Sequence, residues 1–157
     1  MEAPCIRKEA PRVCQKKREK FAVLPENVYL CIQKMKQKEH QVIISLASNE
    51  NQQSHMQSAR ELLNVLLADA VYTPELWTEP VNTHRKEPYL NQLCRATTQL
   101  GANLLGEVLK DMERRLGRTH NEEGIVTIDL DILQYDDQKM HLRDWDRDYV
   151  KKLIDQL

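Results

Sequence analysis

Apolar residues recur with two different spacings between positions 41 and 157, and these spacings predict the regular elements of the chain. Alternating or short continuous apolar runs predict strands at 41–47, 70–77, 89–100 and 125–135. Steps of three and four residues predict one helix over 56–70 and a second that follows a turn at 100–103 and ends near 116. Pro74 lies inside the second predicted strand, which is therefore expected at an edge or a bulge. A short C-terminal helix is expected near 146–157.

The predicted elements follow the order β-α-β-β-α-β, which is the ferredoxin-like split pattern. We therefore predict an α+β fold in which both helices cover one face of an antiparallel sheet. The other face, and the loops at one end of the sheet, would be free for ligands. A single domain of this kind accounts for positions 41–157.

Positions 1–40 show neither spacing and hold three of the six prolines, so we expect a basic N-terminal extension outside the domain. This extension has ten Lys and Arg against five Asp and Glu, whereas 41–157 has thirteen against nineteen. It is either a flexible tail or a segment upstream of a native start at Met35. Nucleic-acid binding is disfavoured because the extension lacks interleaved aromatic residues and the domain is acidic.

The composition indicates a soluble protein, with 41% hydrophobic residues, 30% charged residues and a mean hydropathy of -0.65. No apolar run approaches the roughly 18 residues of a membrane span, and no signal-peptide pattern follows the start. We therefore expect a cytoplasmic protein without membrane contact, and a monomer. The four cysteines form no C-x-x-C pair, which favours free thiols over a zinc site or a disulfide framework.

Two carboxylates lie in the middle of the last predicted strand. Alternation places Asp129 and Asp131 on one face, about 7 Å apart. Thr127 and Leu133 would share that face. The apolar residues beneath the helices would be Val126, Ile128, Leu130 and Ile132. A divalent cation would relieve the repulsion between the two carboxylates, and Mg²⁺ is usually held by one or two carboxylates together with phosphates and waters. The alternative is a solvated strand face with both charges in water.

The chain has no glycine-rich phosphate-binding loop, so side chains would have to hold the phosphates of a nucleotide. Arg118 precedes the two aspartates in the sequence, and His141, Arg143 and Arg147 follow them. Together these residues suit a phosphate clamp around a metal ion. Taken singly, each is better explained as a surface charge.

Five segments carry a resemblance to a known family: ISLASN (44–49), YLNQL (89–93), MERRLGR (112–118), TIDLDIL (127–133) and HLRDWDRDYV (141–150). In this order and spacing they resemble 6-hydroxymethyl-7,8-dihydropterin pyrophosphokinase, an enzyme of folate biosynthesis. The resemblance covers Val42 to about Leu153. It implies transfer of pyrophosphate from ATP to the hydroxymethyl oxygen of a reduced pterin, with release of AMP.

The resemblance also implies a role for individual residues. Asp129 and Asp131 would bind two Mg²⁺ ions that bridge the ATP phosphates, and Arg118 would assist them in catalysis. The pterin would be bound by Thr78, Val81, Tyr89, Asn91 and Tyr149. The ATP would be contacted by Glu113, Arg118, Ile132, His141 and Arg147. These roles fit a reaction that depends on positioning and on charge neutralisation.

The sequence departs from the family pattern just before the two aspartates. The family usually has Gly-Pro-Arg where this chain has Gly124, Ile125 and Val126, so an expected arginine is absent. The loop 119–124 is short and acidic and lacks the usual tryptophan. Two other readings therefore stay open beside the enzyme: a non-catalytic paralogue that binds ATP or pterin, and an interaction domain without a ligand.

Overall fold

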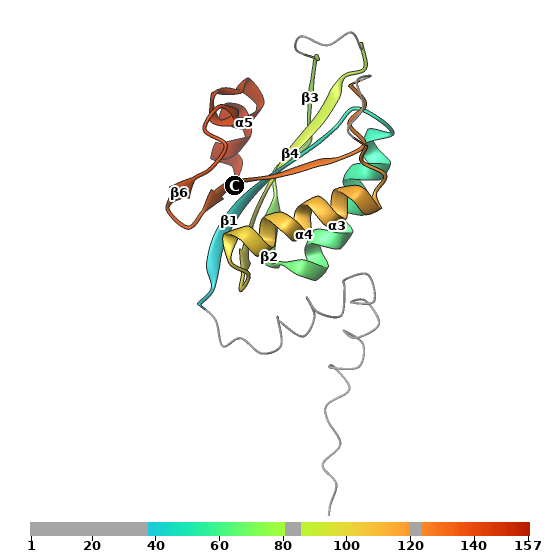
Figure 1. The fold of residues 1–157 in the computed structure, drawn as a ribbon. Helices are drawn as coiled ribbons and strands as arrows, with labels where there is room; N and C mark the ends of the chain where they lie inside the picture. Colours follow the sequence, from blue (N-terminus) through green and yellow to red (C-terminus); the bar gives the residue numbers. More distant parts are fainter. Residues whose placement is uncertain (1–37, 81–85, 120–123) are drawn as a thin grey trace, which may run out of the picture. The chain divides into compact units, whose positions relative to one another are not determined.

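The computed structural model describes residues 38–80, 86–119 and 124–157 (Figure 1). Its elements are β1 (His40–Ser48), α3 (Gln52–Leu66), β2 (Ala68–Tyr72), β3 (Leu76–Thr78), β4 (Tyr89–Thr98), α4 (Ala102–Arg115), β5 (Asp129–Tyr135), β6 (Gln138–Lys139), η2 (Asp144–Asp146), α5 (Asp148–Leu153) and η3 (Ile154–Gln156). The predicted extension lies outside the described residues up to position 37. Its last residue, His40, opens β1.

The strands form one antiparallel sheet in the order β2-β4-β1-β5-β6, with β3 paired to β4. The central strand β1 pairs with β4 on one side and with β5 on the other. The helices α3 and α4 cover the same face of this sheet (Figure 1). The predicted ferredoxin-like α+β fold is therefore confirmed.

The core lies between the sheet and the two helices. From β1 it takes the alternate residues Val42, Ile44 and Leu46, which are at most 1% exposed. The helices contribute fully or almost fully buried residues at three- and four-residue spacings: Met56, Ala59, Leu63, Leu105, Leu109 and Met112. This is the packing that the two sequence spacings predict, because one face of each strand and one stripe of each helix are apolar.

The predicted strand 70–77 is broken in two. Pro74 lies between β2 and β3, both of which pair with β4. The segment between β2 and β3 is bound to β4 by the side chain of Thr73, whose Oγ1 accepts a hydrogen bond from the backbone N–H of Leu93 at 3.0 Å. Pro74 can donate no backbone hydrogen bond to a neighbouring strand, which explains the interruption.

The predicted strand 125–135 begins only at Asp129. Upstream, backbone N–H of Val126 donates to the side chain of Asn49 at 2.7 Å, and Ser48 Oγ donates to the carbonyl of Thr127 at 2.6 Å. These side chains take the place of strand pairing, and the predicted alternation is lost upstream of the fully buried Ile128. Val126 lines the cavity, so the prediction that it lies beneath the helices is wrong. As a result Thr127 is buried, with 8% exposure, and the prediction that it lies beside the aspartates is wrong.

The second face of the sheet is only partly open. The C-terminal segment packs on it through a buried cluster formed by Leu93, Leu133, Val150 and Leu153. Trp145 fixes this segment because its Nε1 donates to the carbonyls of Leu133 and Met140, each at 3.1 Å. The prediction that the face opposite the two helices is free for ligands is therefore wrong for this half of the sheet.

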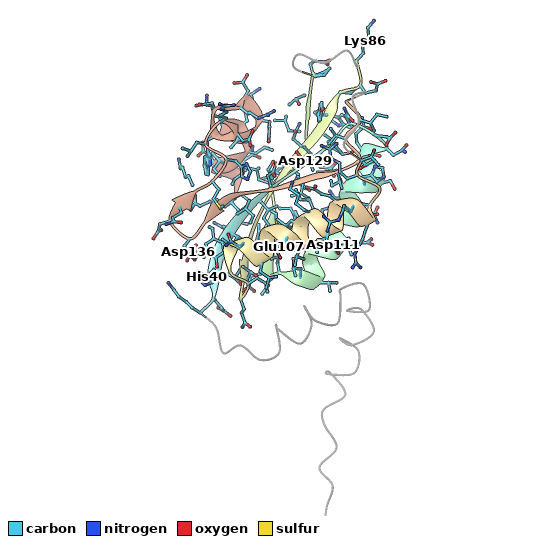
Figure 2. All side chains as sticks on the ribbon, in the orientation of Figure 1. His40, Lys86, Glu107, Asp111, Asp129 and Asp136 are labelled. Carbon is cyan, nitrogen blue, oxygen red and sulfur yellow. The ribbon has the colours of Figure 1, made fainter. Side chains whose placement is uncertain are left out.

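One end of β1 is held by a polar contact. Nδ1 of His40 lies 2.7 Å from Oδ2 of Asp136, and the imidazole ring stacks on Tyr135 with ring centroids 4.8 Å apart. Figure 2 shows His40 and Asp136 together at one end of the sheet, while Asp129 lies nearer the middle.

Within the described ranges, no helix is long and apolar enough to cross a membrane. Cys94 is a buried free thiol, as expected, and the other cysteines lie outside the described residues.

Candidate functional site

A cavity of about 1020 Å³ opens on the part of the second sheet face that the C-terminal segment leaves uncovered. Its floor and walls come from β1, the β3–β4 region, β5 and the segment around α5. The residues that line it are Ser45, Ala47, Trp77, Thr78, Glu79, Tyr89, Asn91, Val126, Asp129, Asp131, Asp144, Asp146, Arg147, Asp148, Tyr149 and Lys152. The site therefore combines residues that are up to about one hundred positions apart in the sequence.

The strand register explains why these side chains meet. Ala47 pairs with Asn91 on β4 and with Asp129 on β5, so the three residues form one row across three strands. Directly opposed residues of antiparallel strands point to the same face. In this row the small side chain of Ala47 forms the floor, with a polar amide on one side and a carboxylate on the other.

The next row contains Ser45, which pairs with Leu93 and with Asp131. Asp129 and Asp131 thus line the same cavity, as alternation predicts for the two of them. Leu93 belongs instead to the buried cluster under the C-terminal segment. The boundary between the open and the covered half of this face therefore runs through the row of Ser45.

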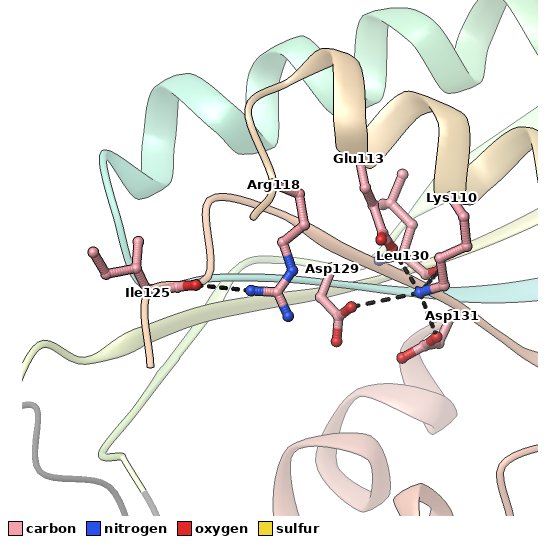
Figure 3. A network of polar contacts seen from close by, with 7 residues as sticks. All are labelled: Lys110, Glu113, Arg118, Ile125, Asp129, Leu130 and Asp131. Carbon is pink, nitrogen blue, oxygen red and sulfur yellow. Dashed lines mark hydrogen bonds and ion pairs between the residues drawn. The ribbon is translucent and has the colours of Figure 1, made fainter. Parts of the chain in front are cut away.

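Lys110, from α4, lies against both aspartates (Figure 3). Its Nζ is 3.1 Å from Oδ1 of Asp131 and 3.6 Å from Oδ1 of Asp129. The same Nζ donates to Oε1 of Glu113 at 2.7 Å and to the carbonyl of Leu130 at 3.3 Å. The repulsion between the two aspartates is thus already reduced by a positive charge from the protein.

Burial raises the pKa of Asp129 above its ordinary value, and the charge of Asp131 adds to this effect. The nearby charges of Lys110 and Arg118 act in the opposite direction. Partial burial lowers the pKa of Lys110, but its hydrogen bond to Glu113 and the charges of the two aspartates outweigh burial and raise it. Lys110 is therefore a permanent cation at neutral pH, whereas the charge on Asp129 is costly to maintain.

Glu113 does not line the cavity. It is 2% exposed, burial raises its pKa, and its Oε1 accepts hydrogen bonds from Lys110 and from the backbone N–H of Leu130, the latter at 2.6 Å. The structure thus places it between α4 and β5. Its predicted contact with ATP stays a prediction.

The predicted cations are divided between the cavity and its surroundings. Arg147 lines the cavity, but its Nε is hydrogen-bonded to Oδ1 of Asp144 at 2.7 Å. Arg118 donates from Nη1 to the carbonyl of Ile125 at 2.8 Å, and its buried Nε has no partner among the described residues. His141 is exposed and does not line the cavity.

Two further predicted residues are not brought to the cavity. Ile132 is 4% exposed and pairs with Ile44, so it lies on the face that α3 and α4 cover. Val81 lies outside the described residues, as does most of the acidic loop 119–124. Val126 does line the cavity, at the position where the resemblance places an arginine.

Four of the five predicted pterin residues line the cavity: Thr78, Tyr89, Asn91 and Tyr149. Nδ2 of Asn91 donates to Oγ1 of Thr78 at 2.9 Å and to the carbonyl of Leu76 at 3.2 Å. Tyr149, from α5, is within hydrogen-bonding distance of Ser45, with 3.1 Å between Oη and Oγ. Burial raises the pKa of Tyr149, so its hydroxyl stays protonated at neutral pH. Two aromatic rings, of Tyr89 and Tyr149, and one oriented amide are thus available to a flat polar ring.

Sequence reasoning missed several residues of this site. Lys110 precedes Glu113 by three positions on one helix, which suggests an ion pair between them. Nothing in that spacing indicates that the pair meets the aspartates. The acidic residues Asp144, Asp146 and Asp148 were also missed, and with Glu79 they bring the cavity lining to six carboxylates against two cationic side chains.

The donor set suits Mg²⁺ held jointly by protein and substrate. In the part of the chain that the structure describes, no group of three or more His, Cys, Asp or Glu side chains is arranged to hold a metal ion. Two carboxylates on a cavity wall are the number that Mg²⁺ commonly takes from a protein when phosphates and waters complete its octahedral shell.

Comparisons with known proteins found a matching family model and similar plant proteins. Residues 43–157 match the family model described as 7,8-dihydro-6-hydroxymethylpterin-pyrophosphokinase. The chain is 32% identical over 125 residues to a mitochondrial folate synthesis bifunctional protein of Arabidopsis thaliana, covering 71% of this chain and 22% of that protein. A mitochondrial folate synthesis bifunctional protein of Pisum sativum is 30% identical over 125 residues, which cover 71% of this chain and 24% of that protein. The chain thus spans about a quarter of the length of these curated relatives.

Proposed function

Because the chain belongs to the 7,8-dihydro-6-hydroxymethylpterin-pyrophosphokinase family, we propose that it transfers pyrophosphate from ATP to 6-hydroxymethyl-7,8-dihydropterin, releasing AMP, in folate biosynthesis. The observation that carries this proposal is the row formed by Asn91, Ala47 and Asp129 across three strands of one cavity. It sets a candidate pterin-binding amide and a candidate metal-binding carboxylate on either side of one small residue.

The two aspartates would hold Mg²⁺ between the protein and the ATP phosphates, with two ions as the family resemblance implies. Bound Mg²⁺ supplies charge neutralisation at the phosphate oxygens. Asp129 and Asp131 fit this task because both line the cavity and because their hydrogen bonds and ion pairs within the described residues use only Oδ1. Each carboxylate therefore keeps a second oxygen for a ligand.

The remaining groups would position the substrates. Asn91 and Thr78 are joined by a hydrogen bond that holds the amide in the cavity wall, where it would bind the edge of the pterin ring. Tyr89 and Tyr149 would flank the pterin, and Arg147 would contact phosphate oxygens at the open side of the cavity. Pyrophosphoryl transfer needs little from the protein beyond such positioning and electrostatic stabilisation, so no additional covalent group is required.

The test is the formation of AMP from ATP, Mg²⁺ and 6-hydroxymethyl-7,8-dihydropterin by the purified protein. We expect AMP with the wild type and a loss of about a hundredfold or more in Asp129→Ala and Asp131→Ala. The matched control is Asp137→Ala, which removes an exposed carboxylate from the β5–β6 turn outside the cavity lining. Equal AMP formation by the wild type and both cavity variants would refute the metal assignment.

A second candidate function is favoured by one observation. Val126 lies in the cavity wall where the family places an arginine, and Arg147 is already paired with Asp144. A non-catalytic paralogue of the same fold would therefore bind Mg-ATP or pterin without forming AMP. Tight ATP binding without AMP supports this candidate, and absence of any Mg-dependent nucleotide binding supports an interaction domain.

The location, oligomeric state and partners of the protein stay predictions. We expect a monomer in the cytoplasm that binds neither nucleic acid nor membranes. The names of one Arabidopsis thaliana relative and one Pisum sativum relative include the word mitochondrial. A mitochondrial location is therefore the alternative to the predicted cytoplasmic one. Cell fractionation and analytical ultracentrifugation of the full chain test the location and the monomer.

A further inference from the structure

The backbone of Leu130 is bound by α4 at an edge of the sheet that no described strand covers. β6 pairs with β5 only at Gln134 and Tyr135, whereas Leu130 faces α4. There Glu113 accepts a hydrogen bond from the N–H of Leu130, and Lys110 donates to its carbonyl. Two side chains of one helix thus replace a neighbouring strand, and they fix the ammonium group of Lys110 at this edge.

This ammonium group, which comes from α4, contacts both aspartates (Figure 3). Asp129 and Asp131 line the cavity, whereas Lys110 is not among its described lining residues. Lys110 meets Oδ1 of each carboxylate, at 3.6 Å and 3.1 Å. Two of the groups that hold Lys110, the carboxylate of Glu113 and the carbonyl of Leu130, belong to residues outside the cavity lining.

We propose that Lys110 is a built-in counter-ion of the two aspartates, which weakens their binding of a free divalent cation and so makes cation binding depend on the nucleotide. An ammonium group within 4 Å of both carboxylates repels an incoming cation, even where the cation would use the Oδ2 atoms that Lys110 does not contact. The phosphates of a nucleotide add negative charge to the cavity and offset this repulsion. The inference rests on the proposed Mg-nucleotide site and adds a positioning residue to it.

The charges near the aspartates give the direction of the effect. Asp129, Asp131 and Glu113 lie near Lys110 and Arg118, and Asp129 also interacts with Arg147, which is itself paired with Asp144. Without Lys110, the negative charge of the three carboxylates is less well balanced. The affinity for a free divalent cation then rises, although the same change removes a hydrogen bond that holds α4 to the sheet edge.

The experiment measures Mn²⁺ binding without nucleotide, from the electron paramagnetic resonance signal of free Mn²⁺, because Mn²⁺ accepts the same oxygen ligands as Mg²⁺. In Lys110→Gln, which keeps a donor for Glu113, we expect Mn²⁺ to bind at least about tenfold more tightly than in the wild type. Lys110→Arg keeps the charge and should bind within about twofold of the wild type. The matched control Arg114→Gln removes an exposed cation from the same helix and should also stay within about twofold.

A merely structural role for Lys110 predicts the opposite sign. If Lys110 only holds α4 to the sheet, a folded Lys110→Gln protein binds Mn²⁺ equally or more weakly, and this result would overturn the proposal. Circular dichroism establishes that each variant is folded. If Lys110→Gln does not fold, the wild type still decides: with a saturating non-hydrolysable ATP analogue, and after subtraction of the Mn²⁺ that the same analogue binds without protein, its Mn²⁺ affinity must rise at least about tenfold. Equal affinity with and without the analogue would overturn the proposal.

Failure of this inference and failure of the proposed function give different results. AMP formation by the wild type together with unchanged Mn²⁺ affinity in Lys110→Gln refutes the counter-ion role of Lys110 and supports the proposed enzymatic activity. Tighter Mn²⁺ binding in Lys110→Gln without AMP formation by the wild type supports the counter-ion role of Lys110 and refutes the proposed enzymatic activity.

Discussion

Leu133 and Asp131 are two residues apart on β5 and point to the same side of the sheet, yet their surroundings are opposite. Leu133 is fully buried against Val150 and Leu153 of α5, whereas Asp131 lines the cavity. Both residues belong to β5, although Asp131 is paired with Ser45 and Leu133 falls where the register with β1 shifts by one residue. The difference comes from the C-terminal segment, which covers one half of this face and leaves the other half open.

The comparison shows that one segment determines both stability and ligand access on this face. Val150 and Leu153 turn inward to the apolar cluster, while Arg147 and Tyr149 line the cavity. A helix of six residues can do both because residues three or four positions apart share a face and the intervening ones do not. Its two roles can be separated by mutation.

The largest expected effect is on the covered half. Leu133→Ala removes a fully buried side chain and should lower the free energy of unfolding by about 2–5 kcal/mol, through lost burial and a residual cavity. Urea denaturation measures this change. The control Leu142→Ala truncates a leucine that is 69% exposed and should change stability by less than about 0.5 kcal/mol. Equal effects at both positions would contradict the division of this face.

The next largest effect is on the open half. Asp129→Asn should reduce the affinity for Mg-ATP by about a hundredfold or more, because a neutral amide oxygen lacks the negative charge with which a carboxylate binds Mg²⁺. Stability should not fall, since burial raises the pKa of Asp129 and its charge is therefore unfavourable to the fold. Isothermal titration calorimetry and urea denaturation measure the two quantities. A destabilised variant with unchanged Mg-ATP affinity would refute the metal assignment.

A smaller effect is expected where the two halves meet. Tyr149→Phe removes the hydroxyl that lies 3.1 Å from Ser45 Oγ, and should cost about 0.5–1.5 kcal/mol of stability. Ser45→Ala should cost a similar amount, and the double variant should cost less than the sum of the two. Strictly additive changes in a double-mutant cycle would show that this hydrogen bond does not couple β1 to α5.

The smallest effect is a pH dependence that contrasts two carboxylates. The hydrogen bond with His40 lowers the pKa of Asp136, whereas burial raises that of Asp129. A depressed folded-state pKa contributes stability above the unfolded value of about 3.9, and this contribution is lost as the pH falls through the folded value. His40→Ala should therefore have a lower urea midpoint than the wild type near pH 6 and approach it near pH 3. Parallel curves would contradict this sign.

Much of the fold follows from the sequence because the spacings are local. Alternation in β1 and β4 and the apolar stripes of α3 and α4 predict the element order, and that order implies the sheet. The same alternation correctly places Asp129 and Asp131 on one face. It fails at Val126 and Thr127 because Ser48 and Asn49, almost eighty residues away, hold that backbone instead of a strand.

The parts of the site that could not be predicted depend on contacts between distant elements. The acidic residues of the C-terminal segment reach the cavity only because Leu153 and Val150 dock on Leu93 and Leu133. Likewise, the spacing of Lys110 and Glu113 indicates a helix but does not indicate which strand edge the helix contacts. The contacts of the C-terminal segment and of Lys110 leave no periodic pattern in the sequence, so a single sequence does not predict them.

The contacts of Leu130 with α4 also affect the tendency of the protein to associate with other copies of itself. An uncovered strand edge presents free N–H and C=O groups on which another chain can add a strand, which leads to aggregation. At Leu130 both groups are occupied by Glu113 and Lys110, and the carboxylates on either side repel an approaching backbone carbonyl. The polar groups that surround the candidate metal site therefore also protect this edge of the sheet against self-association.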